Sequence, residues 1–251
     1  ASNLRNGAFL SSDGYKLIGN SGTHTLREEN GNTYSDDTSS LWDVTAAKQT
    51  GNRFDVLLEG SDGTSKEGYN YIWSTNSSGV ITSGSGWLTD AQTESDANGY
   101  ENKFGKDFNN DGLVSGGSAY QLFGSSNIYT LKNSVGGTYS DDSTSLWDVT
   151  AAKETGSGFD VLIEGSAETI REGYNYIWST NSSGVITSAS GWLTGEQTES
   201  DANGYENKFG KDFNNDGLIS GGSAYQLLGS SGIYTLKNIY GETFTDDSSS
   251  V

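Results

Sequence analysis

Apolar and polar residues alternate along several short runs of this chain, and Gly, Asn and Ser bound each run. A period of two is typical of half-buried β-strands joined by polar turns. Turn-forming residues at 154–157 and 181–184 indicate that successive strands are antiparallel. In the central part of the chain, the pattern predicts strands over 120–123, 128–133, 146–153, 159–164, 174–180 and 185–192.

One segment departs from the strand pattern. Residues 198–209 are mostly polar, and their two aromatic residues, Tyr205 and Phe209, are spaced four apart. Side chains at this spacing lie on the same face of a helix, so we predict one short helix that leads into the following loop. Asn203 and Gly204 interrupt the segment with a turn signal, which favours a short helix over a long one.

The pattern returns along the chain at a fixed interval. Trp42 recurs as Trp147 and Trp87 recurs as Trp192, and both differences are 105 residues (147 − 42 and 192 − 87). Self-similarity at a fixed period is the signature of a repeat architecture. We therefore predict a first tryptophan-rich repeat over 1–118, a second over 119–223, and the N-terminal part of a third over 224–251.

The partial third repeat contains only the two strands that open a complete repeat. An isolated pair of strands is marginally stable in water and exposes unpaired backbone edges. We therefore expect residues 225–245 to pack on the helix and loop at 205–217.

An acidic loop follows the predicted helix in the first repeat. Asp107, Asn109 and Asp111 occupy loop positions one, three and five, and Gly112 occupies position six. This spacing wraps a chain around a hard cation such as Ca2+, with Gly at the sharp turn, and the next residue offers its backbone carbonyl. The carbonyl residue is Leu113, and the second repeat has the same set at Asp212, Asn214, Asp216, Gly217 and Leu218.

Each loop lacks the carboxylate of a full EF-hand loop at position twelve, where Ser118 and Ser223 stand. We expect water or a carboxylate from outside the loop to complete the site, and Ca2+ to bind with a Kd of about 0.1–1 mM, as in extracellular modules. The alternative is a polar turn whose Asx side chains cap the backbone. The candidate carboxylates are Glu101 and Glu206, on the helix that enters the loop, with Asp96 and Asp201 as further options.

Four phrases recur in both complete repeats: LWDVTAAK with Trp42, GYNYIWSTNSSG with Trp73, SGWLT with Trp87, and a closing phrase from Glu101 to Gly112. In these phrases, and over essentially each whole unit, the chain resembles the tryptophan-rich C-terminal repeat domain of cyanobacterial and other bacterial surface and secreted proteins. The resemblance implies an extracellular, repetitive and calcium-associated protein.

Charge excludes two classes of partner. The chain has 14 Lys and Arg against 33 Asp and Glu, a formal net charge of -19. Such a surface repels phosphate backbones and anionic lipid headgroups, so we expect no nucleic-acid binding. No apolar run approaches the roughly 20 residues of a membrane span, so we expect no direct membrane insertion.

The sequence gives no indication of an enzyme. His24 is the only histidine, and Tyr129 and Tyr234 occupy the equivalent positions in the other copies. A catalytic base would not be expected to vary between copies, and no Gly-rich phosphate loop opens a helix. The chain also contains no Cys, which excludes disulfides and thiolate chemistry.

Aromatic residues suggest an alternative function. Tyr69, Tyr71 and Trp73 fall on one face of a predicted strand, where they could stack on sugar rings or fill the core. We expect them to fill the core, because the chain has few other large apolar residues. Trp87 and Trp192 lie beside Gly and Ser and are the better candidates for exposed contacts with a polysaccharide.

Together these patterns predict a mainly β fold of tandem antiparallel sheet or sandwich modules, each with a short helix and an EF-hand-like calcium loop. We expect an extracellular, calcium-binding structural or adhesive repeat protein of a cell surface, fibre or matrix, which self-associates into arrays or fibres. The alternative is a carbohydrate-binding module.

Overall fold

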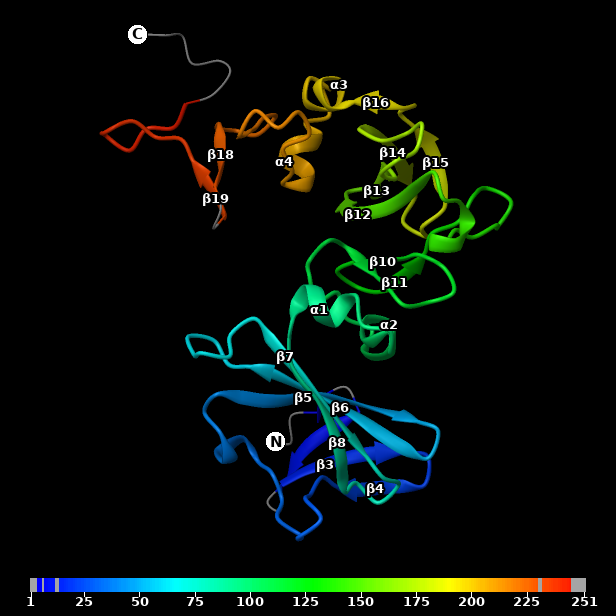
Figure 1. The fold of residues 1–251 in the computed structure, drawn as a ribbon, viewed down its shortest axis with the longest axis vertical. Helices are drawn as coiled ribbons and strands as arrows, with labels where there is room; N and C mark the ends of the chain where they lie inside the picture. Colours follow the sequence, from blue (N-terminus) through cyan, green and yellow to red (C-terminus); the bar gives the residue numbers. More distant parts are fainter. Residues whose placement is uncertain (1–3, 6, 12–13, 230–231, 245–251) are drawn as a thin grey trace. The chain divides into compact units, whose positions relative to one another are not determined.

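The computed structural model describes residues 4–5, 7–11, 14–229 and 232–244 (Figure 1). The chain is mainly β, with antiparallel sheets and a few short helices. It divides into two compact units, one formed by Ala1–Asn109 with Val114–Gly116 and the other by Asn110–Leu113 with Gly117–Val251.

The first unit contains two antiparallel four-stranded sheets. The first sheet has the order β1 (Leu4–Arg5), β2 (Ala8–Ser11), β3 (Gly14–Gly19) and β4 (Gly22–Thr25). The second has the order β5 (Trp42–Thr50), β6 (Arg53–Gly60), β7 (Tyr69–Thr75) and β8 (Ile81–Thr89). A short 3-10 helix, Asp36–Thr38, precedes β5, and helices α1 (Asp90–Glu94) and α2 (Tyr100–Phe104) follow β8.

The second sheet of this unit is covered on both faces. On one face, Val44 and Leu58 pack with Leu17 of the first sheet and with Leu26, which directly follows β4, and the two sheets form a β-sandwich. On the other face, apolar side chains pack against α2 and the segment after it. The register of β5 shifts between Val44 and Ala46, and this bulge directs the two side chains into different clusters. The second cluster consists of Ala46, Leu57, Ile72, Tyr100, Phe104 and Phe108.

The second unit has a corresponding sheet and helix arrangement. Strand β7 spans Tyr69–Thr75 and β14 spans Tyr174–Thr180, a shift of 105 residues (174 − 69). The central sheet has the order β12 (Trp147–Thr155), β13 (Gly158–Gly165), β14 and β15 (Ile186–Ala189), and β16 (Leu193–Thr194) also pairs with β14. The other elements are β9 (Leu113–Val114), β10 (Gln121–Phe123), β11 (Ile128–Thr130), a 3-10 helix at Asp141–Ser143, α3 (Gly195–Glu199) and α4 (Tyr205–Phe209).

A third sheet ends the described chain. It has the order β17 (Leu218–Ile219), β18 (Gln226–Gly229) and β19 (Gly232–Thr235). Leu218 pairs with Leu227, and the amide of Leu228 donates to the carbonyl of Gly217 at 2.9 Å. The opening strands of the third copy therefore pair with β17, just beyond the predicted partner at 205–217, and reach that range through the carbonyl of Gly217. Position 245 lies outside the described residues.

Two sequence predictions about elements are wrong. The helix predicted over 198–209 is two helices, α3 and α4, because Gly204 adopts a left-handed conformation with φ 61 and starts α4 in a new direction. The strand predicted over 185–192 is only β15, which ends at Ala189, and β16 follows beyond the predicted range. Within the described ranges, no helix is long and apolar enough to cross a membrane.

The aromatic row of β7 fills the core only in part. Tyr71 and Trp73 are partly buried and pack against the sandwich core, as predicted. Tyr69 is 39% exposed, so its prediction as a core residue is wrong. Trp87 and Trp192 are half-buried.

Candidate calcium-binding loop

The second acidic loop lies wholly within one compact unit, and a helix cap positions the residues before it. The backbone amide of Gln197 donates to Thr194 Oγ1 at 3.3 Å, while the amide of Thr194 donates to Gln197 Oε1 at 2.9 Å. This reciprocal pair is a capping box, which fixes where α3 begins. The buried Thr198 accepts from Asn175 Nδ2 of β14 at 3.1 Å, so α3 is held on the sheet with Glu199 in its last turn.

Glu206, at the start of α4, holds both ends of the loop. Its side chain is fully buried, at 0% exposure. Oε1 accepts from the backbone amide of Phe213 at 2.8 Å, and Oε2 accepts from the amide and hydroxyl of Ser220 at 2.9 and 3.0 Å. Glu206 is therefore at the loop, as predicted, and makes structural hydrogen bonds there; its role as a Ca2+ ligand stays a prediction.

The first repeat has the same arrangement around Glu101. This side chain is also 0% exposed. It accepts from the amide of Phe108 at 2.7 Å and from the amide of Ser115 at 2.8 Å. The two buried glutamates thus have corresponding partners in the two units, since 108 and 115 are each 105 positions before 213 and 220.

The polar side chains of the second loop converge on its own backbone. Asp212 accepts from the amides of Asp216 at 3.2 Å and Gly217 at 2.7 Å. Asn214 Oδ1 accepts from the amide of Asp216 at 3.0 Å, and Asp216 Oδ1 accepts from the amide of Leu218 at 2.8 Å. The loop therefore gathers carboxylate and amide oxygens at one short turn, directly before Leu218 begins β17.

Glu199 is a loop residue that the sequence analysis missed. Asn214 Nδ2 donates to Glu199 Oε2 at 2.9 Å. Burial raises the pKa of Glu199, and the negative charges of Glu206, Asp216 and Asp212 raise it further. Four carboxylates are therefore crowded around one turn.

The sequence contains one signal that points to Glu199. It lies in the stretch 197–218, which is unchanged from 92–113, so Glu94 occupies its position in the first repeat. The residue stands far ahead of Asp212 along the chain, and only the turn between α3 and α4 brings it back to the loop.

The division between the units falls within the first loop, after Asn109. On the first side, Asp107 is buried, at 8% exposure. On the second side, Asp111 Oδ1 accepts from the amide of Leu113 at 2.7 Å, and the carbonyl of Asp111 accepts from the amide of Ala152 at 2.7 Å. The second half of this loop is thus bonded to β12 as part of that strand's own unit.

Gly112 is required at its position for two reasons. Its φ of 87 lies in the left-handed region, which disfavours a side chain. A Cβ atom there would also lie 1.8 Å from the carbonyl oxygen of Ala152. Gly217 has the same φ, 87, but its Cβ position is open.

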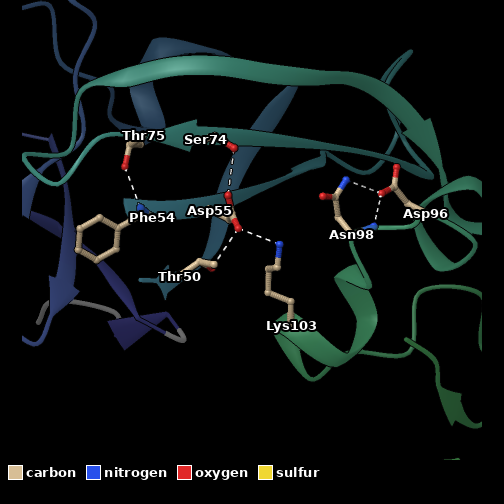
Figure 2. A network of polar contacts seen from close by, with 8 residues as sticks. All are labelled: Thr50, Phe54, Asp55, Ser74, Thr75, Asp96, Asn98 and Lys103. Carbon is tan, nitrogen blue, oxygen red and sulfur yellow. Dashed lines mark hydrogen bonds and ion pairs between the residues drawn. The ribbon is translucent and has the colours of Figure 1, made fainter. Parts of the chain in front are cut away.

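The other candidate carboxylates, Asp96 and Asp201, hold the turn between the two helices. Asp96 Oδ1 accepts from the amide and the side-chain nitrogen of Asn98, both at 2.8 Å (Figure 2). Asp201 makes the corresponding bonds to Asn203 at 2.8 and 2.7 Å. These are Asx turns, which stabilise the connection between the helices.

An ion pair anchors the second helix on the sheet (Figure 2). Asp55 of β6 is 2% exposed and accepts from Lys103 Nζ at 2.8 Å, Ser74 Oγ at 3.0 Å and Thr50 Oγ1 at 3.1 Å. Burial acts to raise the pKa of Asp55, but the hydrogen bond and charge of Lys103 outweigh it and lower the pKa. In the second unit, Lys208 pairs with Asp160 at 2.5 Å.

The donor set fits a hard cation. Every candidate ligand offers oxygen from a carboxylate, an amide or a backbone carbonyl, the ligands that Ca2+ prefers. Within the described ranges, no three His, Cys, Asp or Glu side chains are already arranged to hold a metal ion. A Ca2+ site here would therefore use amide and carbonyl oxygens together with a shift of the crowded carboxylates.

No protein-family model, no curated protein and no solved structure matches this chain. The resemblance to the tryptophan-rich repeat family therefore stays a prediction.

Proposed function

We propose that this chain is an extracellular, calcium-binding structural or adhesive repeat protein, whose acidic loops bind Ca2+. The observation that carries the proposal is that Asp212, Asn214 and Asp216 gather their oxygens at one turn and Asn214 holds Glu199 there. Burial raises the pKa of Glu199, and the charges of Glu206, Asp216 and Asp212 raise it further. In the described part of the chain, none of these four carboxylates forms an ion pair with Lys or Arg. A divalent cation would relieve their mutual repulsion.

The proposed ligands of the second loop are the side chains of Asp212, Asn214 and Asp216 and the carbonyl of Leu218. Glu199 supplies the carboxylate that loop position twelve lacks, because Asn214 already holds it at the loop. Glu206 holds the two ends of the loop by accepting from the backbone amides of Phe213 and Ser220. In the first repeat the corresponding residues are Asp107, Asn109, Asp111 and Leu113, with Glu94 and Glu101.

The expected affinity favours a location outside the cell. A site with an incomplete ligand set has a Kd of about 0.1–1 mM, and only extracellular Ca2+ reaches that range. Ca2+ then contributes by binding the folded loop and not the unfolded chain, so it stiffens each loop. Neutralising part of the -19 net charge also lowers the repulsion that opposes self-association into arrays or fibres.

Thermal unfolding tests the proposal. For a Kd of about 0.5 mM, CaCl2 at about 5 mM stabilises each folded site by about 1.4 kcal/mol, and the melting temperature rises. Replacing Asp107 and Asp212 with Ala should remove most of the rise. Melting curves that coincide in CaCl2 and in chelator would refute calcium binding.

A further inference from the structure

All 6 tryptophans of the chain lie in two aromatic clusters, one in each compact unit. We propose that each cluster forms a pocket that binds a pyranose ring of a neutral polysaccharide. This site is separate from the acidic loops, and its argument does not depend on calcium.

The pocket of the first unit lies on the face of the sheet β5–β8 that packs against the first sheet, among the half-buried aromatic side chains of that face. It has a volume of about 210 Å³ and is lined by Trp42, Leu58, Tyr71, Trp73 and Trp87. Leu58 pairs with Tyr71 across β6 and β7, and Tyr71 pairs with Trp87 across β7 and β8, so three strands build one row. Leu58 is buried at the base, whereas the four aromatic side chains are half-buried and remain accessible.

The aromatic rings meet at steep angles. The centroids of Trp42 and Trp73 are 5.4 Å apart with an interplanar angle of 84°. Those of Tyr71 and Trp87 are 5.4 Å apart at 72°. Edge-to-face contacts of this kind fix the orientation of each ring. The pocket therefore has rigid aromatic walls, which reduces the ordering that binding requires.

The second unit retains the aromatic set. Trp147 and Trp178 have centroids 5.4 Å apart at 87°, and those of Tyr176 and Trp192 are 5.2 Å apart at 60°. Ile163 takes the place of Leu58, which preserves an aliphatic base. Trp192 is half-buried and packs on the edge of this core, so part of its ring remains accessible.

A cation lies over the outer tryptophan in both units. Lys66 Nζ is 4.8 Å from the ring centroid of Trp87, and Arg171 is 4.7 Å from that of Trp192. The residue type differs between the two units, yet both carry a positive charge and their distances from the ring centroid differ by only 0.1 Å (4.8 − 4.7).

The cation over the outer tryptophan disfavours cationic ligands, and the net negative charge of the chain disfavours anionic ones. A quaternary ammonium group would enter an aromatic pocket through cation–π attraction, but here it would meet a positive charge already on the outer ring. Anionic glycans are repelled by a chain of net charge -19. A neutral sugar meets neither penalty, because it carries no charge and its apolar ring face can stack on an aromatic wall of the pocket.

The size of the pocket limits what it binds. Sites for drug-sized ligands have volumes of about 300–1,000 Å³, so a pocket of about 210 Å³ suits one ring of a longer chain. We therefore expect weak binding to each pocket, with a Kd near about 1 mM for an oligosaccharide.

The experiment follows the indole N–H signals of the 6 tryptophans by NMR, in chelator, while a ligand is added. The probes are cellohexaose, maltohexaose and chitohexaose, with choline and a galacturonate oligomer as charged comparisons. At least one neutral hexaose should shift these signals saturably, and neither charged probe should. Unmoved signals with all three hexaoses at about 10 mM, or a larger response to choline, would overturn the proposal.

Variants locate the binding. Combined Trp87→Ala and Trp192→Ala should weaken binding of the responding hexaose at least about tenfold. Lys66→Glu combined with Arg171→Glu should also weaken it, and this change leaves the apolar core in place if the tryptophan variant unfolds. Val135→Ser, at a residue 90% exposed, is the matched control and should bind as the original chain does. Undiminished binding by the folded charge variant would overturn the proposed role of the rim cation, and undiminished binding by the folded tryptophan variant would overturn the site.

Discussion

The buried carboxylate of Glu206 gives a sharp test of how the loop is supported. Glu206→Gln keeps the shape of the side chain and replaces one oxygen with an NH2 group. Glu206 accepts from the amides of Phe213 and Ser220 through different oxygens, so the NH2 group must face one of these donors. One backbone amide is then left without an acceptor in a buried place.

The magnitude follows from that lost acceptor. An unsatisfied buried donor costs about 1–3 kcal/mol, and the remaining bonds lose the extra strength of a charged acceptor. Removing one negative charge beside Glu199 and Asp216 offsets part of this cost, by about 1 kcal/mol at an effective dielectric constant of the protein surface. We expect a net loss of about 2–3 kcal/mol in the free energy of unfolding of the second unit.

Urea unfolding and amide hydrogen exchange measure this loss. Exchange should accelerate most at Phe213 and Ser220, since their amides are the donors to Glu206. Glu29→Gln is the matched control, because it makes the same charge change at an exposed residue, where substitutions alter stability by less than about 0.5 kcal/mol. If both variants unfold alike and exchange at Phe213 is unchanged, Glu206 does not hold the loop.

Two further predictions concern the supports of the first loop. Lys103→Met should cost about 2–3 kcal/mol near neutral pH, because it leaves the buried Asp55 without its ion-pair partner. Because the pKa of Asp55 is lowered in the folded chain, the ion pair stabilises the fold fully above the unfolded pKa of about 3.9, and this stabilisation is lost as the pH falls through the folded pKa. Urea unfolding should therefore show that the free energies of unfolding of the original chain and of Lys103→Met converge in acid. A difference between them that stays constant with pH would contradict this. Gly112→Ala should destabilise the chain more than Gly217→Ala. Both substitutions cost about 1–2 kcal/mol because of the left-handed backbone, but only the new Cβ at position 112 would clash with the carbonyl of Ala152. Equal melting temperatures for the two glycine variants would argue against that close contact.

Local sequence pattern predicted the strands because alternation and turn residues are local features. The strand expected over 174–180 is β14, Tyr174–Thr180, in which aromatic residues stand at every second position from Tyr174 to Trp178. The helix was predicted less well, because Gly204 breaks it through a backbone conformation that the spacing of Tyr205 and Phe209 does not reveal.

Only the local part of the candidate site was predicted from the sequence. The loop spacing from Asp212 to Gly217 is local and visible in the sequence, and Glu206 lies one helical segment before it. Glu199 reaches the loop only because two short helices meet at a turn, so its contact with Asn214 depends on the tertiary fold. The exposure of Tyr69 likewise depends on what covers the sheet, since strand periodicity assigns a face but not its cover.

The most direct test of the central claim is an NMR titration of the loop amides with CaCl2. The signals of Gly217 and Leu218 should shift saturably with a Kd of about 0.1–1 mM, Asp212→Ala should abolish the response, and Glu199→Gln should weaken it. Signals that stay unmoved at about 10 mM CaCl2, or that shift equally in the Asp212→Ala variant, would contradict calcium binding by this loop.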